Sequence, residues 1–176
     1  NDEMGAVISM EMGAPIDMAV RDQAGSGSSH LKAFIRALGS MEFQRALRPG
    51  IEGQDIAYEA AGVAGLITPW NWPMNQVVLK VGAALAAGCT MVLKPSEIAP
   101  LSSVVFAEMV HEVGFPPGVF NMVNGDGDGV GSILSSHPGI DVVSFTGSTR
   151  AGIHISKAAA DTVKTVSLEL GGKSPN

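Results

Sequence analysis

The chain has 176 residues, of which 45% are hydrophobic and 16% are charged, with a mean hydropathy of +0.24. This composition is typical of a globular chain with one sizeable core and excludes a disordered chain. The formal net charge of −6 comes without a basic stripe, so we expect no nucleic-acid partner. The single cysteine, Cys89, excludes an internal disulfide and a metal site built on several thiolates.

Residues 1–45 contain no run of β-branched residues and are predicted to be helical. Apolar residues recur at helical spacing within residues 4–12 and again within residues 31–38. Residues 25–29 read Gly-Ser-Gly-Ser-Ser, and two interpretations stay open for them: a flexible linker, or a weakened part of a long helix. The segment begins with Asn1 rather than Met and shows no secretion signal. We therefore expect further residues upstream and a cytoplasmic protein.

Residues 46–60 are predicted to form part of a β-hairpin. Arg48-Pro49-Gly50 is a turn signal, and residues 55–59 alternate polar and apolar side chains, as a half-exposed strand would.

From residue 61 onward, short apolar strands alternate with helical segments. The predicted strands are residues 62–68, 90–93, 119–123, 142–145 and 166–168, and the predicted helices are residues 76–87, 101–113, 130–135 and 149–160. This alternation predicts an α/β fold with a parallel sheet covered on both faces, and a ligand at the carboxyl ends of the strands.

The apolar stretch at residues 77–93 has two interpretations, a membrane span or a helix followed by a buried strand. It contains Lys80, Gly82 and Gly88, and Lys94 follows directly. A spanning helix needs about 20 apolar residues. We therefore interpret the stretch as a helix, a turn and a buried strand, and we expect no membrane partner.

Asn71 lies between two prolines in the sequence Pro-Trp-Asn-Trp-Pro of residues 69–73, at the end of the first predicted strand. The prolines restrict the backbone on both sides of the carboxamide. A neutral amide donor in a fixed position can stabilise a developing oxyanion. The pattern alone leaves a second interpretation equally open, in which Asn71 satisfies backbone groups of the turn.

Lys94 and Glu97 belong to the sequence Lys-Pro-Ser-Glu at the end of the second predicted strand. At such a position they can hydrogen-bond the ribose hydroxyls of a nucleotide. A carboxylate there favours NAD and repels the 2′-phosphate of NADP. For this motif alone, an exposed ion pair at a helix start is the better interpretation.

Residues 124–131 read Asn-Gly-Asp-Gly-Asp-Gly-Val-Gly and look like a dinucleotide fingerprint. They do not match G-x-G-x-x-G, because Val130 and Ser132 stand where the third glycine is required. The two aspartates would also repel a pyrophosphate placed beside them. The segment is therefore not predicted to be the phosphate site.

Residues 145–149, Phe-Thr-Gly-Ser-Thr, are the better phosphate candidate. Gly147 allows close approach of the backbone, and Ser148 opens a helix whose free N–H groups attract an anion. Gly152, one turn later, would allow that helix to pack closely. An ordinary Ser/Thr helix cap explains the motif if it stands alone.

Glu169 lies at an apolar strand end, directly before Gly171-Gly172. A carboxylate desolvated in this position is suited to act as a general base. For an isolated carboxylate, a buried glutamate that caps backbone groups is the favoured interpretation. Cys89 lies at the amino end of a strand, away from these motifs, so we interpret it as a buried apolar residue and not as a nucleophile.

The motifs at residues 69–73, 94–97, 145–149 and 168–176 closely resemble those of the NAD(P)-dependent aldehyde dehydrogenase superfamily in order and near-family spacing. The resemblance implies a variant Rossmann fold, with a doubly wound parallel sheet, N-terminal helices and part of an oligomerisation β-hairpin. The family's catalytic cysteine lies beyond residue 176. We therefore expect these residues to be the front part of a longer enzyme.

The resemblance also implies an organisation and a role for each motif. Its segments are a helical part at 1–45, a partial hairpin at 46–60 and a truncated NAD-binding domain at 61–176. Asn71 would be the oxyanion donor and Glu169 the base that activates water. The cofactor-binding residues would be Thr68, Pro69, Trp70, Lys94, Ser96, Glu97, Gly127, Gly147, Ser148, Leu170 and Gly171, and no metal is expected.

Lys80 matches a family lysine linked to proton relay, although a surface lysine with a buried aliphatic stem fits it equally well. The implied reaction is oxidation of an aldehyde to a carboxylic acid with NAD, or alternatively NADP, through a cysteine thioester. A homodimer or homotetramer is implied for the full-length protein, and this chain alone is expected to be inactive. The alternatives are a stand-alone or catalytically dead dinucleotide-binding module, and a CoA-acylating relative, against which Glu169 argues.

Overall fold

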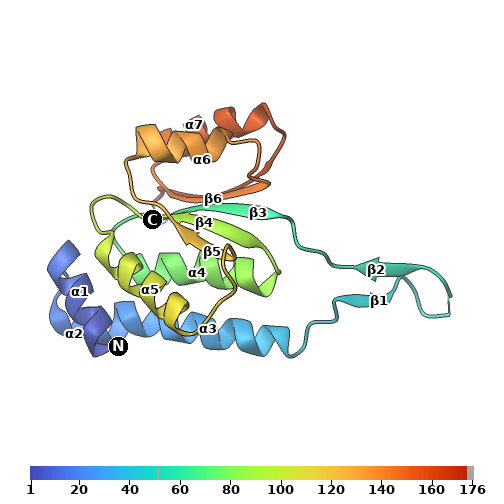
Figure 1. The fold of residues 1–176 in the computed structure, drawn as a ribbon, viewed down its shortest axis with the longest axis horizontal. Coiled ribbons are helices and arrows are strands. Elements are labelled where there is room, and N and C mark those ends of the chain that lie inside the picture. The colour runs from blue at the N-terminus through green and yellow to red at the C-terminus, as the bar shows by residue number, and fades with distance from the viewer. Residues whose placement is uncertain (51, 174–176) are drawn as a thin grey trace.

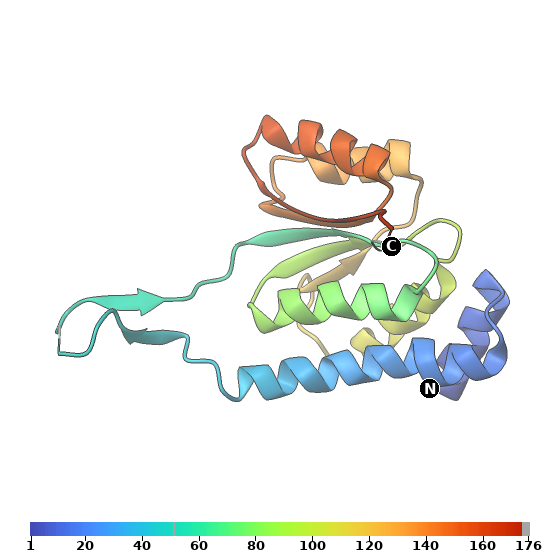
Figure 2. The same cartoon turned by 180° about the vertical axis from the view of Figure 1, so that it is seen from behind.

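The computed structural model describes residues 1–50 and 52–173, and it confirms the predicted α/β fold. A helical N-terminal segment packs beneath a parallel sheet with helices on its two sides, and a two-stranded hairpin projects from one end (Figures 1 and 2). Residues 51 and 174–176, in the predicted hairpin and in the last motif, lie outside the described residues. No helix within the described ranges has the length and apolar character needed to cross a membrane.

Four helical pieces make up the N-terminal segment. They are α1 (Asp2–Met12), α2 (Ile16–Met18), the π-helical η1 (Ala19–Ala24) and α3 (Gly25–Leu38). Residues 25–29 are helical and follow η1 without a break, so the interpretation as part of a long helix is confirmed. Gly27 is buried beside Met74 and Val78, and a Cβ at this position would make ordinary van der Waals contact with them.

The hairpin begins earlier than predicted. Helix α3 ends at Leu38, and β1 (Gln44–Ala46) pairs antiparallel with β2 (Asp55–Ala57). Residues 44 and 45 are therefore strand, and the helical prediction for them is wrong. Only the second strand has a visible alternation, with Ile56 half-buried, because all three residues of the first are exposed.

All five predicted strands are confirmed, with boundaries that differ from the prediction by at most two residues. They are β3 (Val63–Ile67), β4 (Thr90–Lys94), β5 (Phe120–Met122), β6 (Val142–Gly147) and β7 (Thr165–Leu170). The strands are parallel in the order β5-β4-β3-β6-β7. The chain runs outward from β3 to β5 on one side and from β6 to β7 on the other. The position between β3 and β6 is thus the switch point at which such sheets bind ligands.

Helices of the sheet domain lie in two layers. These helices are α4 (Pro73–Ala86), α5 (Leu101–Glu112), the π-helical η2 (Gly127–Gly131), α6 (Ser132–Ser136) and α7 (Thr149–Ala160). Helices α4 and α5 lie on one side of the sheet, and α6 and α7 lie on the other (Figures 1 and 2). Each layer encloses its own apolar cluster, one around Val77 and Leu93 and the other around Val143 and Ile155.

The sheet is not covered on both faces along its whole width, which corrects the prediction. On β6, Val143 and Phe145 are buried in the cluster beneath α6 and α7, whereas Ser144 and Thr146 belong to the opposite face. That face lines an open cleft. The alternation of apolar and polar residues along β6 is the pattern of a strand covered on one face only.

A long-range contact joins the N-terminal helices to the sheet domain. The carboxylate of Glu11 accepts hydrogen bonds from the backbone N–H groups of Leu101, at 2.6 Å, and Ser102, at 3.1 Å. These groups are at the start of α5, where backbone donors lack partners within the helix. Glu11 therefore caps α5 across 90 residues of sequence.

Candidate active site

A cleft of about 970 Å³ lies between α4 and the uncovered face of β6 and β7. Most of the predicted site residues line it. They are Pro69, Trp70, Asn71, Lys80, Gly147, Ser148, Glu169, Leu170 and Gly171. The structure thus brings together, at the switch point of the sheet, residues that are up to 102 positions apart in the sequence (69 to 171).

Lys80 is buried at the wall of this cleft, so the interpretation as a surface lysine is wrong. Its Nζ donates a hydrogen bond to the Ser144 hydroxyl of β6 at 2.8 Å. Burial lowers the pKa of Lys80 to about 8, while the charge of Glu169 acts in the opposite direction. Near neutral pH the lysine can therefore release and take up a proton more readily than an ordinary lysine.

Asn71 and Glu169 line the same cleft but are both exposed. Within residues 1–50 and 52–173, neither side chain makes a hydrogen bond. The predicted desolvation of Glu169 is therefore wrong for this chain, as is its interpretation as a buried cap. The reason is that β7 is an edge strand whose cleft face carries no helix. For Asn71, the absence of a turn contact leaves the carboxamide free to meet a ligand.

The segment at residues 145–149 has the predicted geometry of a strand end followed by a helix. Ser148 caps α7, its hydroxyl accepting a hydrogen bond from the Ala151 N–H at 3.2 Å. A Cβ at Gly147 would collide with the Phe145 ring. A Cβ at Gly152 would lie 2.6 Å from a Leu170 methyl carbon, so the predicted close packing of this helix is confirmed. The capped helix start borders the cleft at Gly147 and Ser148.

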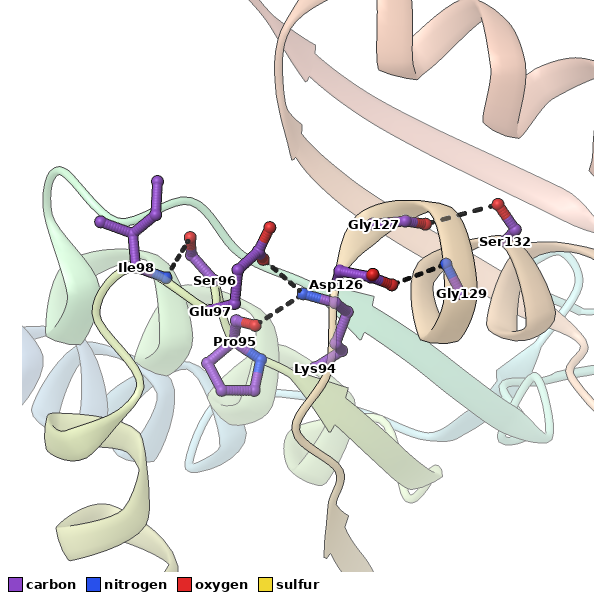
Figure 3. Close-up of polar contacts among 9 residues, drawn as sticks. All are labelled: Lys94, Pro95, Ser96, Glu97, Ile98, Asp126, Gly127, Gly129 and Ser132. Atoms are coloured by element: carbon purple, nitrogen blue, oxygen red, sulfur yellow. Dashed lines mark hydrogen bonds and ion pairs between the residues drawn. The ribbon is translucent and has the colours of Figure 1, made fainter.

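A second group of predicted residues lies at the ends of β4 and β5 (Figure 3). Lys94 is buried, and its Nζ donates to the Pro95 carbonyl at 2.9 Å and to Glu97 Oε2 at 3.1 Å. The interpretation of this motif as an exposed pair at a helix start is therefore wrong for the lysine, and α5 begins only at Leu101. Ser96 accepts a hydrogen bond from the Ile98 N–H at 3.3 Å.

Glu97 remains exposed, and its pKa lies below the ordinary value. The largest cause is a hydrogen bond with its own backbone, followed by the opposing effect of desolvation and by the bond from Lys94. Thr68 connects this group to the cleft, because its N–H donates to the Lys94 carbonyl at 3.2 Å. The carboxylate is thus charged and open to hydroxyl donors.

Gly127 begins η2, and its carbonyl accepts a hydrogen bond from the Ser132 hydroxyl at 3.3 Å. Asp126 caps the same helix, with Oδ1 accepting from the Gly129 N–H at 2.7 Å. A carboxylate therefore already occupies the start of this helix (Figure 3). This agrees with the prediction that residues 124–131 do not hold the pyrophosphate.

Sequence reasoning missed three polar residues of the site. Ser144 was not identified as the partner of Lys80, nor Asp126 as a fixed cap. The hydroxyl of Thr146 is buried beside the cleft and has no hydrogen-bond partner within the described ranges. Ser144 and Thr146 follow each other at a spacing of two in β6, and this alternation was the available signal. Within the same ranges, no group of three His, Cys, Asp or Glu side chains could hold a metal ion.

The chain is similar to known proteins over nearly its whole length. The model of the aldehyde dehydrogenase family matches residues 1–176. A curated relative, 3-succinoylsemialdehyde-pyridine dehydrogenase from a Pseudomonas species, is 56% identical over 176 residues, covering 99% of this chain and 36% of the relative. The chain thus spans about a third of the length of such relatives.

Solved structures show the same architecture. An aldehyde dehydrogenase from Bartonella henselae has 62% identity and a TM-score of 0.97, over 99% of this chain and 37% of that one. Aldehyde dehydrogenase C from Pseudomonas syringae, a cysteine-to-alanine mutant crystallised with NAD+ and octanal, has 50% identity and a TM-score of 0.95, over 99% and 35%. With the family match over its whole length, this chain belongs to the aldehyde dehydrogenase family.

Proposed function

We propose that this chain forms the cofactor-binding part of an NAD-dependent aldehyde dehydrogenase that oxidises an aldehyde to a carboxylic acid. One observation carries the proposal: Asn71, Lys80 and Glu169 converge on the same cleft as Gly147 and Ser148. An amide donor, a lysine with a lowered pKa and a free carboxylate are thus next to a glycine-serine helix start. This combination suits anion binding and proton transfer at one place.

The residues present fit a dinucleotide. Lys94 and Glu97 would hold the hydroxyls of the adenine ribose, and Gly147 and Ser148 would hold the pyrophosphate at the start of α7. Thr68, Pro69, Trp70, Ser96, Gly127, Leu170 and Gly171 would complete the binding surface. The unpaired Thr146 hydroxyl beside the cleft suits a polar ligand. When bound, NAD supplies the acceptor for a hydride, and NADP is the alternative cofactor.

Three side chains of this chain would each have a separate role in the reaction. The Asn71 amide donates to the oxygen of the aldehyde as negative charge develops there. Glu169 accepts a proton from the water that hydrolyses the acyl group. Lys80, held by Ser144, carries a proton to or from the cleft. The nucleophile would be a cysteine beyond residue 176, in line with the cysteine-to-alanine relative, and the acyl group would be carried as its thioester.

We further propose that the hairpin of β1 and β2 belongs to an oligomerisation element, that the helices before it form a separate segment, and that residues 61–176 belong to the NAD-binding domain. The projecting hairpin supports this, because its strands are almost fully exposed. An exposed pair of strands has unpaired edges that invite a further strand. A homodimer or homotetramer in the cytoplasm would provide one.

The test is NADH formation by the natural-length protein with a panel of aldehydes. We expect NADH with NAD and aldehyde in the absence of CoA. NAD binding without turnover would favour the binding-module alternative, and a strict requirement for CoA would favour the CoA-acylating alternative. The 176-residue chain is expected to form no NADH, and the Cys89→Ser variant should behave identically. Steady NADH production by this chain that Cys89→Ser abolishes would contradict the proposal.

A further inference from the structure

Two carboxylates from different loops flank the buried Lys94 (Figure 3). Glu97 follows β4, and its Oε2 is 3.1 Å from Lys94 Nζ. Asp126 follows β5, at the start of η2. The negative charge of Asp126 reaches Glu97, on which it acts to raise the pKa against the effect of Lys94. The region at the ends of β4 and β5 therefore carries two acidic groups and one basic group. We call this region, with Lys94, Glu97 and Asp126, the ribose end of the crevice.

Asp126 cannot easily turn away from this position. Its Oδ1 accepts a hydrogen bond from the Gly129 N–H at 2.7 Å. The loop before it is tightly packed, because a Cβ at Gly125 would collide with Val130, and Gly125 has a φ of 157°. The side chain is exposed, so its charge faces any ligand that enters beside Glu97.

The charge of Lys94 is already balanced by Glu97, and two of its three N–H donors are used, which leaves one for a ribose hydroxyl. Its Nζ is already bonded to the Pro95 carbonyl and to Glu97, and the residue is 2% exposed. A ribose hydroxyl is neutral and can donate to a carboxylate, whereas a 2′-phosphate brings about two negative charges. The group formed by Glu97, Lys94 and Asp126 carries a net charge of −1, from two acids and one base. This group should therefore bind a ribose hydroxyl and repel a 2′-phosphate.

We propose that Asp126 is a second specificity-determining residue, which acts with Glu97 to exclude NADP from the ribose end of the crevice. The inference rests on the proposed function, because it takes the adenine ribose to bind at Lys94 and Glu97. The fixed aspartate also keeps the start of η2 closed to phosphate, which leaves the start of α7 as the phosphate-binding helix.

The experiment compares Asp126→Asn with Asp128→Asn in the natural-length protein. Asparagine keeps an oxygen that can accept from the Gly129 N–H, so the cap is retained while the charge is lost. Asp128 is an exposed aspartate of the same helix and makes no side-chain hydrogen bond within the described residues, which makes it the matched control. The dissociation constants of NAD and NADP are measured by calorimetry for each protein.

We expect Asp126→Asn to tighten NADP binding about fivefold or more while NAD binding changes less than about twofold. Asp128→Asn should change the ratio of the two constants by less than about twofold, because Asp126, and not Asp128, is among the charges that act on Glu97. Raising the salt concentration should narrow the preference for NAD in the wild type and do so less in Asp126→Asn. A purely structural role of the cap would not produce this salt dependence.

If the ratio of the NAD and NADP dissociation constants were the same in Asp126→Asn, Asp128→Asn and the wild type, with NAD still bound, the inference would be overturned. The proposed function would not be affected by that result. Failure of the wild type to bind either nucleotide would overturn the proposed function as well. Asp126→Ser provides a second variant that keeps a capping oxygen without charge. If Asp126→Asn proves unfolded, the same shift in ratio is required of the serine variant, and its absence would count against the inference.

Discussion

The two ends of the crevice differ in how completely their side chains are held. At the ribose end, Lys94, Glu97 and Asp126 each have a hydrogen-bond partner within the chain. At the cleft end, Asn71 and Glu169 are exposed and make no side-chain hydrogen bond within residues 1–50 and 52–173. The ribose end is organised by its own loops, whereas at the cleft end Lys80 is held by Ser144 but Asn71 and Glu169 are not oriented by a hydrogen bond.

This difference has a physical meaning for the reaction. Cofactor recognition depends on fixed charges and backbone groups, which neighbouring loops of one sheet edge can supply. A general base and an oxyanion donor work best when water is excluded around them. On the open face of β6 and β7 that exclusion requires a covering surface, which the described residues do not provide. Mutations at the cleft end should therefore mainly lower turnover, and mutations at the ribose end should mainly change cofactor binding.

The sharpest test of the cleft end is Glu169→Gln in the natural-length protein. We expect turnover to fall by about 10²–10⁴-fold, because a lost general base costs about this much. The first turnover should persist as a burst of NADH while the acyl-enzyme accumulates. Glu108→Gln, an exposed glutamate of α5, is the control and should leave turnover unchanged. Unchanged turnover without a burst would remove Glu169 from the mechanism.

The next largest effect is expected for Asn71→Ala. Loss of one oxyanion donor typically lowers turnover by about 10²–10³-fold. Gln76→Ala, which removes another amide from the lining of the same cleft, serves as the control. Steady-state kinetics with NAD and an aldehyde measure both variants. If Asn71→Ala weakened only NAD binding and spared turnover, the residue would belong with the ribose end instead.

Lys80 allows a test by pH, because its pKa is lowered to about 8 in the folded protein from an ordinary value of 10.5. Between these values the unfolded chain binds more protons, so the free energy of unfolding should rise with pH. Below the lower value both states are protonated, and the cost of burying the charge is present in full. Lys80→Met should therefore be more stable than the wild type near neutral pH, by about 1–2 kcal/mol after allowing for partial exposure.

Urea unfolding of the wild type and Lys80→Met at about pH 7 and about pH 9.5 measures this difference. The difference in the free energy of unfolding between the two proteins should be smaller at the higher pH. Lys157→Met, at an exposed position of α7, is the control. If this difference in the free energy of unfolding did not change with pH, Lys80 would not be desolvated in solution.

The smallest expected effect concerns the contact that anchors the N-terminal helices. Glu11→Ala removes the cap of α5 and should lower the free energy of unfolding by about 1 kcal/mol. Glu3→Ala, at an exposed position of α1, should have a clearly smaller effect. Denaturant unfolding compares the two variants. Equal effects would show that the bonds from Leu101 and Ser102 contribute nothing measurable.

Local patterns allowed much of the sheet domain to be predicted. Short apolar runs bounded by glycine and proline identified all five strands, and the helix at residues 149–160 was predicted with its observed ends. Features that depend on local conformation, such as the cap at Ser148, follow from adjacent residues. The first hairpin strand was missed because three exposed residues carry no periodic signal.

The residues of the candidate site were predicted from the sequence, but whether each of them is buried or exposed was not. Glu169 was expected to be desolvated and is exposed, whereas Lys80 fitted a surface lysine and is buried. Burial depends on what packs above a residue, and the packing partner is distant in the sequence. Ser144, for example, lies 64 positions from the lysine that it binds.

The sequence by itself determined the alternation of strands and helices, the position of the motifs at the carboxyl ends of the strands and the family to which the chain belongs. These follow from side-chain periodicity and from the rule that parallel strands end at one edge. The tertiary structure alone decided which face of β6 and β7 is open, which of Lys80 and Glu169 is buried, and that Glu11 and Asp126 cap helices. Each of these depends on contacts, or missing contacts, between groups that the local pattern does not bring together.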